Sequence, residues 1–207
     1  MQSRLPIAVL VSGSGSNLQA ILDASAEPGY SADVCVVISD RSEIWALERA
    51  AAAGVPVEVV DWSDYGNRAA FTAAVCDVAD RYGASALVLA GFLRILGDSA
   101  MRRFPDRILN IHPSLLPAFP GTIHAVQEAL DHGAKVTGVT VHFVTADVDA
   151  GPIIAQEAVV VMPGDDAASL HARVQEVEHR LYPAVVDALG RRALVVEGRW
   201  VTWKEKS

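Results

Sequence analysis

The strongest constraint on the fold is a series of short segments that are apolar at every position, each followed by a stretch with helical spacing. Such segments cover residues 7–11, 34–38, 86–90 and, more briefly, 108–111. A strand that is apolar throughout belongs in a sheet that is buried on both faces. Strands that alternate with helices are joined by crossover connections and run parallel. The first half of the chain therefore predicts an open, mostly parallel α/β sheet with helices on both faces.

The helical segments and the edge of this sheet can also be placed. Helical spacing of apolar residues occurs at 17–26, 44–53, 67–82 and 166–189. The last of these contains Pro183, which predicts a break or a bend at that point. Residues 55–60 predict a further strand that includes Pro56. Because proline cannot donate to a central ladder, this strand is expected at the edge of the sheet.

The last third of the chain has a different pattern. Two apolar segments, 139–144 and 153–161, are separated by a turn that contains Asp149-Ala150-Gly151-Pro152. So short a connection joins antiparallel strands. Residues 194–202 predict a terminal hairpin. We therefore expect a small antiparallel portion at the C-terminal end of the sheet.

The composition excludes several classes of protein. With 51% hydrophobic and 20% charged residues, the chain is not intrinsically disordered. No apolar run approaches the roughly 20 residues that cross a membrane. The net charge of −8 argues against a nucleic-acid partner, because phosphate backbones require a basic face. A short polar start, with Cys35 and Cys76 inside apolar patterns, predicts a cytoplasmic chain with reduced thiols.

Asn110 and His112 are the principal candidates for catalysis. They lie two residues apart in an extended segment, so their side chains point the same way. Pro113 restricts His112 to extended backbone, which suits a strand that opens into a loop. An amide donor beside a titratable imidazole can polarise a carbonyl and move a proton. The alternative is a polar strand end without a catalytic role.

Asp149 is the candidate partner of His112. A carboxylate near an imidazole orients the ring and favours its charged form. The alternative is that Asp149 only begins the turn before Gly151 and Pro152. The sequence alone does not bring residues 112 and 149 together.

A glycine-serine turn at residues 12–16 follows the first apolar segment. In a parallel sheet this turn lies at the carboxyl end of a strand, where ligands bind. Free N–H groups at the helix start, with Ser16 and Asn17, suit a phosphate; the alternative is helix capping alone. Asp40 would suit a dinucleotide, but Leu18 occupies the place of the third glycine of that motif. A monophosphate is the better prediction.

Two further groups of residues are ambiguous. The apolar loop at residues 91–96 suits a slot for a flat heterocycle, or else simply packs against the core. The remaining histidines show no spacing typical of metal ligands; they are His124, His132, His142, His171 and His179. We expect no metal, and we expect most of these histidines on the surface or in the core.

Several segments, in this order, resemble the phosphoribosylglycinamide formyltransferases, which are folate-dependent enzymes of purine biosynthesis. They are residues 12–20, 89–96, 110–117, 139–144 with 149–152, and 173–179. The resemblance covers nearly the whole chain. It implies the formyltransferase fold, a Rossmann-like sheet in a single domain over residues 1–207. Residues 1–110 would form a nucleotide-binding-like half and residues 111–207 a folate and catalytic half.

The resemblance also implies an activity, namely transfer of the formyl group of 10-formyltetrahydrofolate to the amine of 5-phosphoribosylglycinamide. The catalytic residues would be Asn110, His112 and Asp149. The substrate phosphate and ribose would be bound by Gly15, Ser16, Asn17, Gln175 and Glu178. The folate would be bound by Asn110, Arg68, Leu93, Arg94, Ile95 and Leu96. His124 is also expected at the phosphate. This expectation is weaker, because the chain is about one residue longer than the family after Gly121.

Four alternatives remain, and one of them is a non-catalytic folate- or phosphate-binding protein. A hydrolase that releases formate from the same folate would carry an extra N-terminal regulatory domain, which we do not expect here. A methionyl-tRNA formyltransferase would need a C-terminal RNA-binding domain and a basic face, and we expect neither. An NAD-dependent module would leave Asn110 and His112 unexplained. The expected partners are small molecules, and the expected state is a monomer or a homodimer.

Overall fold

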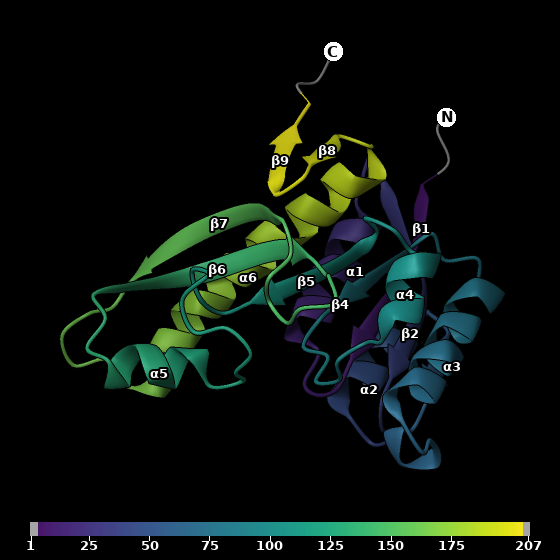
Figure 1. Ribbon diagram of the computed structural model, residues 1–207, viewed down its shortest axis with the longest axis horizontal. Coiled ribbons are helices and arrows are strands. Elements are labelled where there is room, and N and C mark those ends of the chain that lie inside the picture. The colour runs from purple at the N-terminus through teal and green to yellow at the C-terminus, as the bar shows by residue number, and fades with distance from the viewer. Residues whose placement is uncertain (1–3, 205–207) are drawn as a thin grey trace.

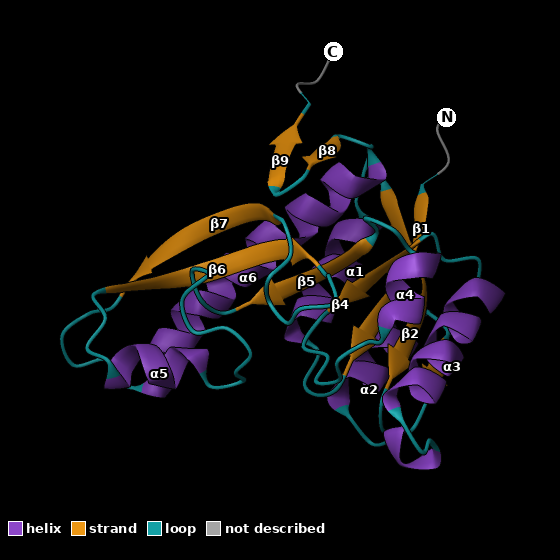
Figure 2. Ribbon diagram, in the orientation of Figure 1, coloured by secondary structure: helices purple, strands orange, loops and turns teal. Residues whose placement is uncertain are grey.

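A seven-stranded sheet in the order β3-β2-β1-β4-β5-β6-β7 runs through the computed structural model, which describes residues 4–204 (Figures 1 and 2). Its strands are β1 (Leu5–Val11), β2 (Ala32–Ser39), β3 (Val57–Val59), β4 (Ala86–Leu89), β5 (Ile108–His112), β6 (Val136–Phe143) and β7 (Ile153–Val160). A separate hairpin consists of β8 (Leu194–Glu197) and β9 (Trp200–Trp203). Residues 1–3, which entered the expectation of a cytoplasmic chain, lie outside the described residues.

The strand directions confirm the predicted sheet. Strands β3, β2, β1, β4 and β5 are parallel, whereas β6 runs antiparallel to β5 and β7 antiparallel to β6. Strand β3 lies at one edge, directly after Pro56, as expected for a segment that lacks one ladder donor. The sheet therefore changes from parallel to antiparallel at β5, the strand that carries Asn110 and His112.

Helices cover both faces of the sheet. They are α1 (Ser16–Ala26), α2 (Trp45–Ala52), α3 (Arg68–Arg81), α4 (Asp98–Arg103), α5 (Ala125–Asp131) and α6 (Ala167–Gly190), with a 3-10 turn at Trp62–Asp64. Alternate residues of β1 enter two different cores: Ile7 and Val9 pack with α1 and α6, and Ala8 and Leu10 pack with α3 and α4. Burial on both faces explains why these strands are apolar at every position.

Helix α6 is a single element of 24 residues. It begins with a capping box, in which the Asp166 side chain accepts from the Ser169 N–H and the Ser169 side chain accepts from the Asp166 N–H. The helix continues through Pro183 without the break that the sequence allowed, although proline removes the N–H that would bond one turn back. Its first half reaches the site described below.

The two described ends of the chain lie at the amino ends of the strands (Figure 1). Strand β1 begins at Leu5. The Leu5 N–H donates to the carbonyl of Ser31, the residue directly before β2. At the other end, the Lys204 N–H donates to Ala193, just beyond α6. The functional candidates follow the opposite, carboxyl ends of the parallel strands. Among the described helices, none is both long enough and apolar enough to cross a membrane.

Candidate active site

A cavity of about 440 Å³ opens at the carboxyl ends of β1, β4 and β5. The turn after β1, the loop after β4, the connection between β6 and β7, and one face of α6 all contribute to its wall. It is lined by most of the residues predicted for the site, namely Ser16, Asn17, Leu93, Arg94, Ile95, Leu96, Asn110, His112, Asp149, Gln175 and Glu178. Segments far apart in the sequence therefore meet in one hollow, at the position where parallel α/β sheets bind ligands.

Asn110, His112 and Asp149 lie together on one wall. His112 Nδ1 is 3.3 Å from Asp149 Oδ2, and Asn110 Nδ2 is 3.4 Å from Asp149 Oδ1. The Gly121 N–H donates to Asp149 Oδ2 at 2.8 Å, which fixes the carboxylate from the other side. The structure thus brings Asp149 to the Asn110 and His112 pair, a contact that the sequence could not establish.

Both ring nitrogens of His112 face acceptors. Its Nε2–H donates to the carbonyl of Phe119 at 2.8 Å, and Nδ1 faces the Asp149 carboxylate. Since a carbonyl and a carboxylate only accept, both contacts are satisfied only when the ring carries two protons. The surroundings of His112 therefore suit the imidazolium, which can act as an acid.

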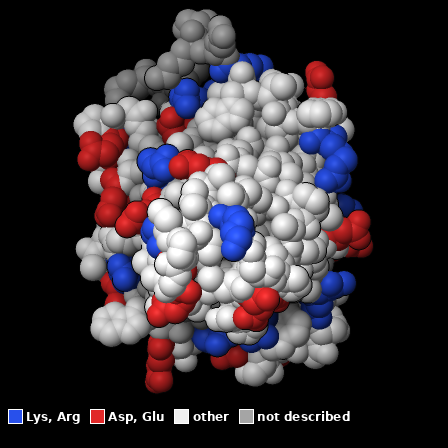
Figure 3. Space-filling view, turned by 90° about the vertical axis from the view of Figure 1, so that its left-hand side faces the viewer, with Lys and Arg blue, Asp and Glu red and all other residues white. Residues whose placement is uncertain are grey.

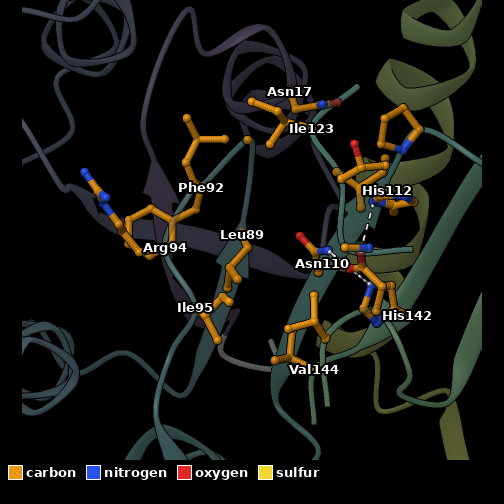
Figure 4. Close-up of a pocket in the computed structure, with 18 of the residues that line it drawn as sticks. Asn17, Leu89, Phe92, Arg94, Ile95, Asn110, His112, Ile123, His142 and Val144 are labelled. Carbon is orange, nitrogen blue, oxygen red and sulfur yellow. Dashed lines mark hydrogen bonds and ion pairs between the residues drawn. The ribbon is translucent and has the colours of Figure 1, made fainter. Parts of the chain in front are cut away.

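His142 is a fourth member of this group. The register of β5 and β6 pairs it with Asn110, whose Nδ2 donates to His142 Nε2 at 3.1 Å. The other ring nitrogen, Nδ1, donates to the carbonyl of Phe143 at 2.9 Å, which fixes the tautomer. Nε2 is also 3.5 Å from Asp149 Oδ1. Figure 4 shows Asn110, His112 and His142 together, opposite the side chains of Leu89 and Ile95.

The charge of Asp149 is stabilised by its neighbours. Burial raises the pKa of Asp149, but the neighbouring His142 side chain, the hydrogen bond from the Gly121 N–H and the charge of His112 together hold it below its ordinary value. Asp149 also has φ of 52°, a left-handed conformation that aspartate tolerates better than most residues. The carboxylate is therefore ionised near neutral pH and held in one orientation.

The start of α1 forms the other end of the cavity. Gly15 has φ of 73°, and a Cβ built on it would lie 2.7 Å from the Cβ of Ala46. No side chain caps this helix, so capping does not account for Ser16 and Asn17. The side chains instead meet α6: Gln175 Nε2 is 3.4 Å from Ser16 Oγ, and Asn17 Nδ2 donates to Glu178 at 3.0 Å. This leaves N–H groups at the start of α1 available to an anion.

The loop after β4 forms a third part of the wall. The residues from Leu93 to Leu96 line the cavity, but the guanidinium of Arg94 is turned away from Asn110 (Figure 4). Arg94 Nε donates to Asp40 Oδ2 at 2.6 Å. Asp40 is itself buried and does not line the cavity, so it is not placed to bind a ribose there, as the dinucleotide alternative requires.

Comparison with known proteins identifies the family of this chain. The sequence model described as "Formyl transferase" matches residues 5–186. The phosphoribosylglycinamide formyltransferase of Mycobacterium tuberculosis is 47% identical over 200 residues, which cover 97% of this chain and 92% of that protein. The chain belongs to the phosphoribosylglycinamide formyltransferase family.

Two further proteins are similar to this chain. The crystal structure of glycinamide ribonucleotide transformylase 1 from Symbiobacterium toebii superposes with a TM-score of 0.96 and 48% identity, over 99% of this chain and 96% of that one. The trifunctional purine biosynthetic protein adenosine-3 of Bos taurus is 46% identical over 200 residues, but the match covers 95% of this chain and only 20% of that protein. The chain thus spans about a fifth of the length of the trifunctional relatives.

Three of the predicted residues do not line the cavity. Gly15 lies beside it, within the turn that shapes the start of α1. Arg68 is the first residue of α3 and is exposed, with its side chain next to Gly97 at the end of the loop after β4. His124 is exposed at the start of α5, where its N–H donates to Thr122 Oγ1.

Sequence reasoning missed two histidines that line the cavity, His142 and His171. His171 lies one turn before Gln175 on α6, and this spacing could have revealed it once Gln175 was assigned to the site. The role of His142 depends on which residue of β5 lies opposite it. Neither segment alone determines that register. Within residues 4–204, no group of three or more histidine, cysteine or carboxylate side chains is arranged to hold a metal ion.

The surface of the molecule carries both signs of charge. Figure 3 shows the face that includes α5 and the adjoining ends of β6 and β7, and acidic and basic side chains are interspersed around a largely uncharged centre. A continuous basic stripe, which nucleic-acid backbones require, is not present on the face shown.

Proposed function

We propose that the chain transfers the formyl group of 10-formyltetrahydrofolate to the amine of 5-phosphoribosylglycinamide, giving N-formylglycinamide ribonucleotide and tetrahydrofolate. The observation that carries the proposal is a single cavity that holds both the Asn110, His112 and Asp149 group and the free start of α1. The 47% identity to the Mycobacterium tuberculosis phosphoribosylglycinamide formyltransferase supports this choice of reaction.

The phosphoribosyl substrate is assigned to the α1 end of the cavity. Backbone N–H groups after Gly15 and the positive end of the helix dipole suit a phosphate. Ser16, Asn17 and Gln175 supply further polar contacts, and Glu178 accepts hydrogen bonds from the ribose hydroxyls. The substrate amine then points toward Asn110 and His112.

The folate is assigned to the loop after β4. Its flat pterin ring enters between Leu93 and Leu96, where backbone groups recognise its edge and apolar side chains cover its faces. Arg68, beside Gly97 at the end of this loop, meets the anionic tail of the folate outside the cavity.

The chemical step needs stabilisation of an oxyanion. The amine attacks the formyl carbon, a new carbon–nitrogen bond forms, and the formyl oxygen becomes negatively charged. Asn110 Nδ2–H and His112 Nε2–H donate to that oxygen, each contributing on the order of 3 kcal/mol. The formyl oxygen replaces the Phe119 carbonyl as the acceptor of the His112 Nε2–H hydrogen bond.

Collapse of this intermediate completes the transfer. The bond from the formyl carbon to the folate nitrogen breaks, and the proton lost by the amine is carried to that nitrogen through a water held by Asp149. Asp149 also keeps His112 charged, while His142 accepts from Asn110 and orients its amide. We extend the proposal to small-molecule partners only, a monomeric or homodimeric state, a cytoplasmic location, and one domain with the two halves given above.

The deciding experiment follows the folate absorbance with and without the ribonucleotide amine. We expect turnover only when both substrates are present. Turnover that ignores the amine would instead identify a formyl-folate hydrolase. Folate binding without turnover under either condition would identify a binding protein and contradict the proposal.

His112→Ala and Asp149→Asn test the assignment of the catalytic group. Each should lower kcat by about a hundred-fold or more, since each removes a positioned acid or the group that keeps it charged. The matched control is Asp131→Asn, which changes an exposed carboxylate on α5. Near-wild-type kcat in either cavity variant would remove that residue from the mechanism.

A further inference from the structure

Asp40 has no part in the proposed chemistry, yet it is a buried charge close to the folate side of the cavity. It directly follows β2 and is 1% exposed. Its Oδ2 accepts from Arg94 Nε at 2.6 Å and from Arg41 Nη2 at 3.2 Å. Burial raises the pKa of Asp40, but hydrogen bonds from Arg41, Ser12 and Arg94 bring it below its ordinary value. A carboxylate that is both buried and charged must be held by its partners.

Two neighbouring residues of the loop after β4 are attached to Asp40. Arg94 is bonded to it directly. The Leu93 N–H donates to Ser12 Oγ at 2.9 Å, and the Ser12 hydroxyl is a hydrogen-bond partner of the Asp40 carboxylate. Ser12 is 4% exposed, so this relay is shielded from water. One carboxylate thus fixes both the backbone of Leu93 and the side chain of Arg94.

Asp40 also positions Trp62, whose ring packs against Arg94. The Arg94 guanidinium stands 5.1 Å from the centre of the Trp62 ring, a cation–π contact. The Trp62 N–H donates to the carbonyl of Asp40 at 3.2 Å. The backbone of Asp40 therefore positions Trp62, and its side chain positions Arg94 against that ring.

The loop needs such attachments because two of its apolar side chains do not pack into the core. Leu93 is 51% exposed and Ile95 is 49% exposed, although both are apolar. At the far end, the Gly97 N–H donates to Thr72 Oγ1 at 2.9 Å. Polar bonds at both ends leave Leu93 and Ile95 free to cover a flat apolar ligand.

We propose that Asp40 is a positioning residue for folate binding, which holds the loop from Leu93 to Ile95 in the shape that receives the pterin. The inference rests on the proposed function for the identity of the ligand. It predicts that the ion pair of Asp40 and Arg94 influences the folate and leaves the phosphoribosyl substrate unaffected, because the latter is assigned to the opposite end of the cavity.

The test measures the dissociation constant of 5-formyltetrahydrofolate by calorimetry, and the KM of each substrate, for Asp40→Asn, Arg94→Gln and the double variant. Loss of a charged hydrogen bond should weaken folate binding about ten-fold in each single variant. The double variant should be no weaker than the single ones, because both remove the same pair. The KM of the ribonucleotide should stay within about two-fold of wild type.

Arg41→Gln is the matched control, because Arg41 pairs with the same carboxylate but lies outside the loop. It should leave folate binding unchanged. An equal effect of Arg41→Gln, a double variant as weak as the product of the single effects, or a parallel rise in both KM values would overturn the inference. If Asp40→Asn does not fold, Arg94→Gln tests the same pair from a side chain that is 31% exposed.

The outcomes separate the inference from the proposed function. A wild-type chain that binds the folate without transferring formyl would contradict the proposed function, and the binding constants would still decide the role of Asp40. A wild-type chain that does not bind the folate would overturn both.

Discussion

At the scale of single residues, Glu178 combines burial with an ionisable group. Burial raises its pKa from 4.5 to about 7, an effect only partly opposed by the hydrogen bond from Asn17. Between pH 4.5 and pH 7 the folded chain therefore keeps a proton that the unfolded chain has released. The free energy of unfolding consequently falls as pH rises through this window, by about 3 kcal/mol in total.

Glu178→Gln should remove this dependence and leave a more stable chain at neutral pH. Urea unfolding from about pH 5 to about pH 8 measures the difference between variant and wild type. Glu176→Gln changes an exposed carboxylate of the same helix and should keep the wild-type slope. Parallel pH profiles for wild type and Glu178→Gln would show that Glu178 does not hold the proton.

The site residues differ in how far the sequence reveals them. Asn110 and His112 are found from the sequence because strand periodicity and Pro113 act within a few residues. Asp149 is a candidate by residue type alone, since its distance from His112 depends on the whole connection between β6 and β7. His142 is not found, because its contact with Asn110 depends on how β5 and β6 pair. The two residues are 32 positions apart in the sequence.

At the scale of elements, the connection between β6 and β7 depends on a close backbone approach. A Cβ built on Gly151 would lie 1.8 Å from the carbonyl oxygen of Phe143. The same carbonyl accepts from His142, and Asp149 is two residues before the glycine. A side chain at position 151 must therefore displace groups on both sides of the site.

Gly151→Ala should lower kcat on the order of ten- to a hundred-fold, because small displacements of reacting groups have large kinetic effects. The chain should still fold, which circular dichroism would check. Gly66→Ala is the control, since a Cβ there meets nothing within 4 Å. Full activity in Gly151→Ala would mean that the turn adapts without moving Asp149.

The elements themselves were largely predictable, and the exceptions have physical causes. Continuous apolar runs identify buried parallel strands, and Pro56 identifies the edge strand. Pro183 suggested a break in α6 that does not occur, because tertiary packing retains the helix: Val177, Tyr182 and Val185 are all buried around it. At Pro183, the packing of the helix into the core outweighs the helix-breaking tendency of proline.

At the scale of the whole molecule, Tyr182 joins the long helix α6 to the middle of the sheet. Its ring is fully buried, and its hydroxyl lies 2.9 Å from the carbonyl of Leu89 and 3.1 Å from that of Leu109. Burial raises the pKa of Tyr182 well above 10.0, so it remains a donor. Helix α6 is thereby bonded to β4 and β5, two neighbouring strands in the middle of the sheet.

Tyr182→Phe should destabilise the whole chain by about 1–3 kcal/mol, because it leaves buried carbonyls without a donor. Urea unfolding should show one transition at a lower midpoint with an unchanged slope, by both tryptophan fluorescence and circular dichroism. Tyr65→Phe, where the partly buried ring meets Phe71 edge-on, should change stability by less than about 0.5 kcal/mol. Two separate transitions would indicate that the halves unfold independently.

The position of the two described ends, Arg4 and Lys204, has a practical consequence for handling the protein. Both Arg4 and Lys204 lie near the amino ends of the strands, and the cavity opens at their carboxyl ends. Tethering the chain to a sensor surface, or fusing a fluorescent partner to it, through either end would leave the mouth of the cavity facing solution. The same placement suits a segment that, in the trifunctional relatives, is covalently joined to other sequence.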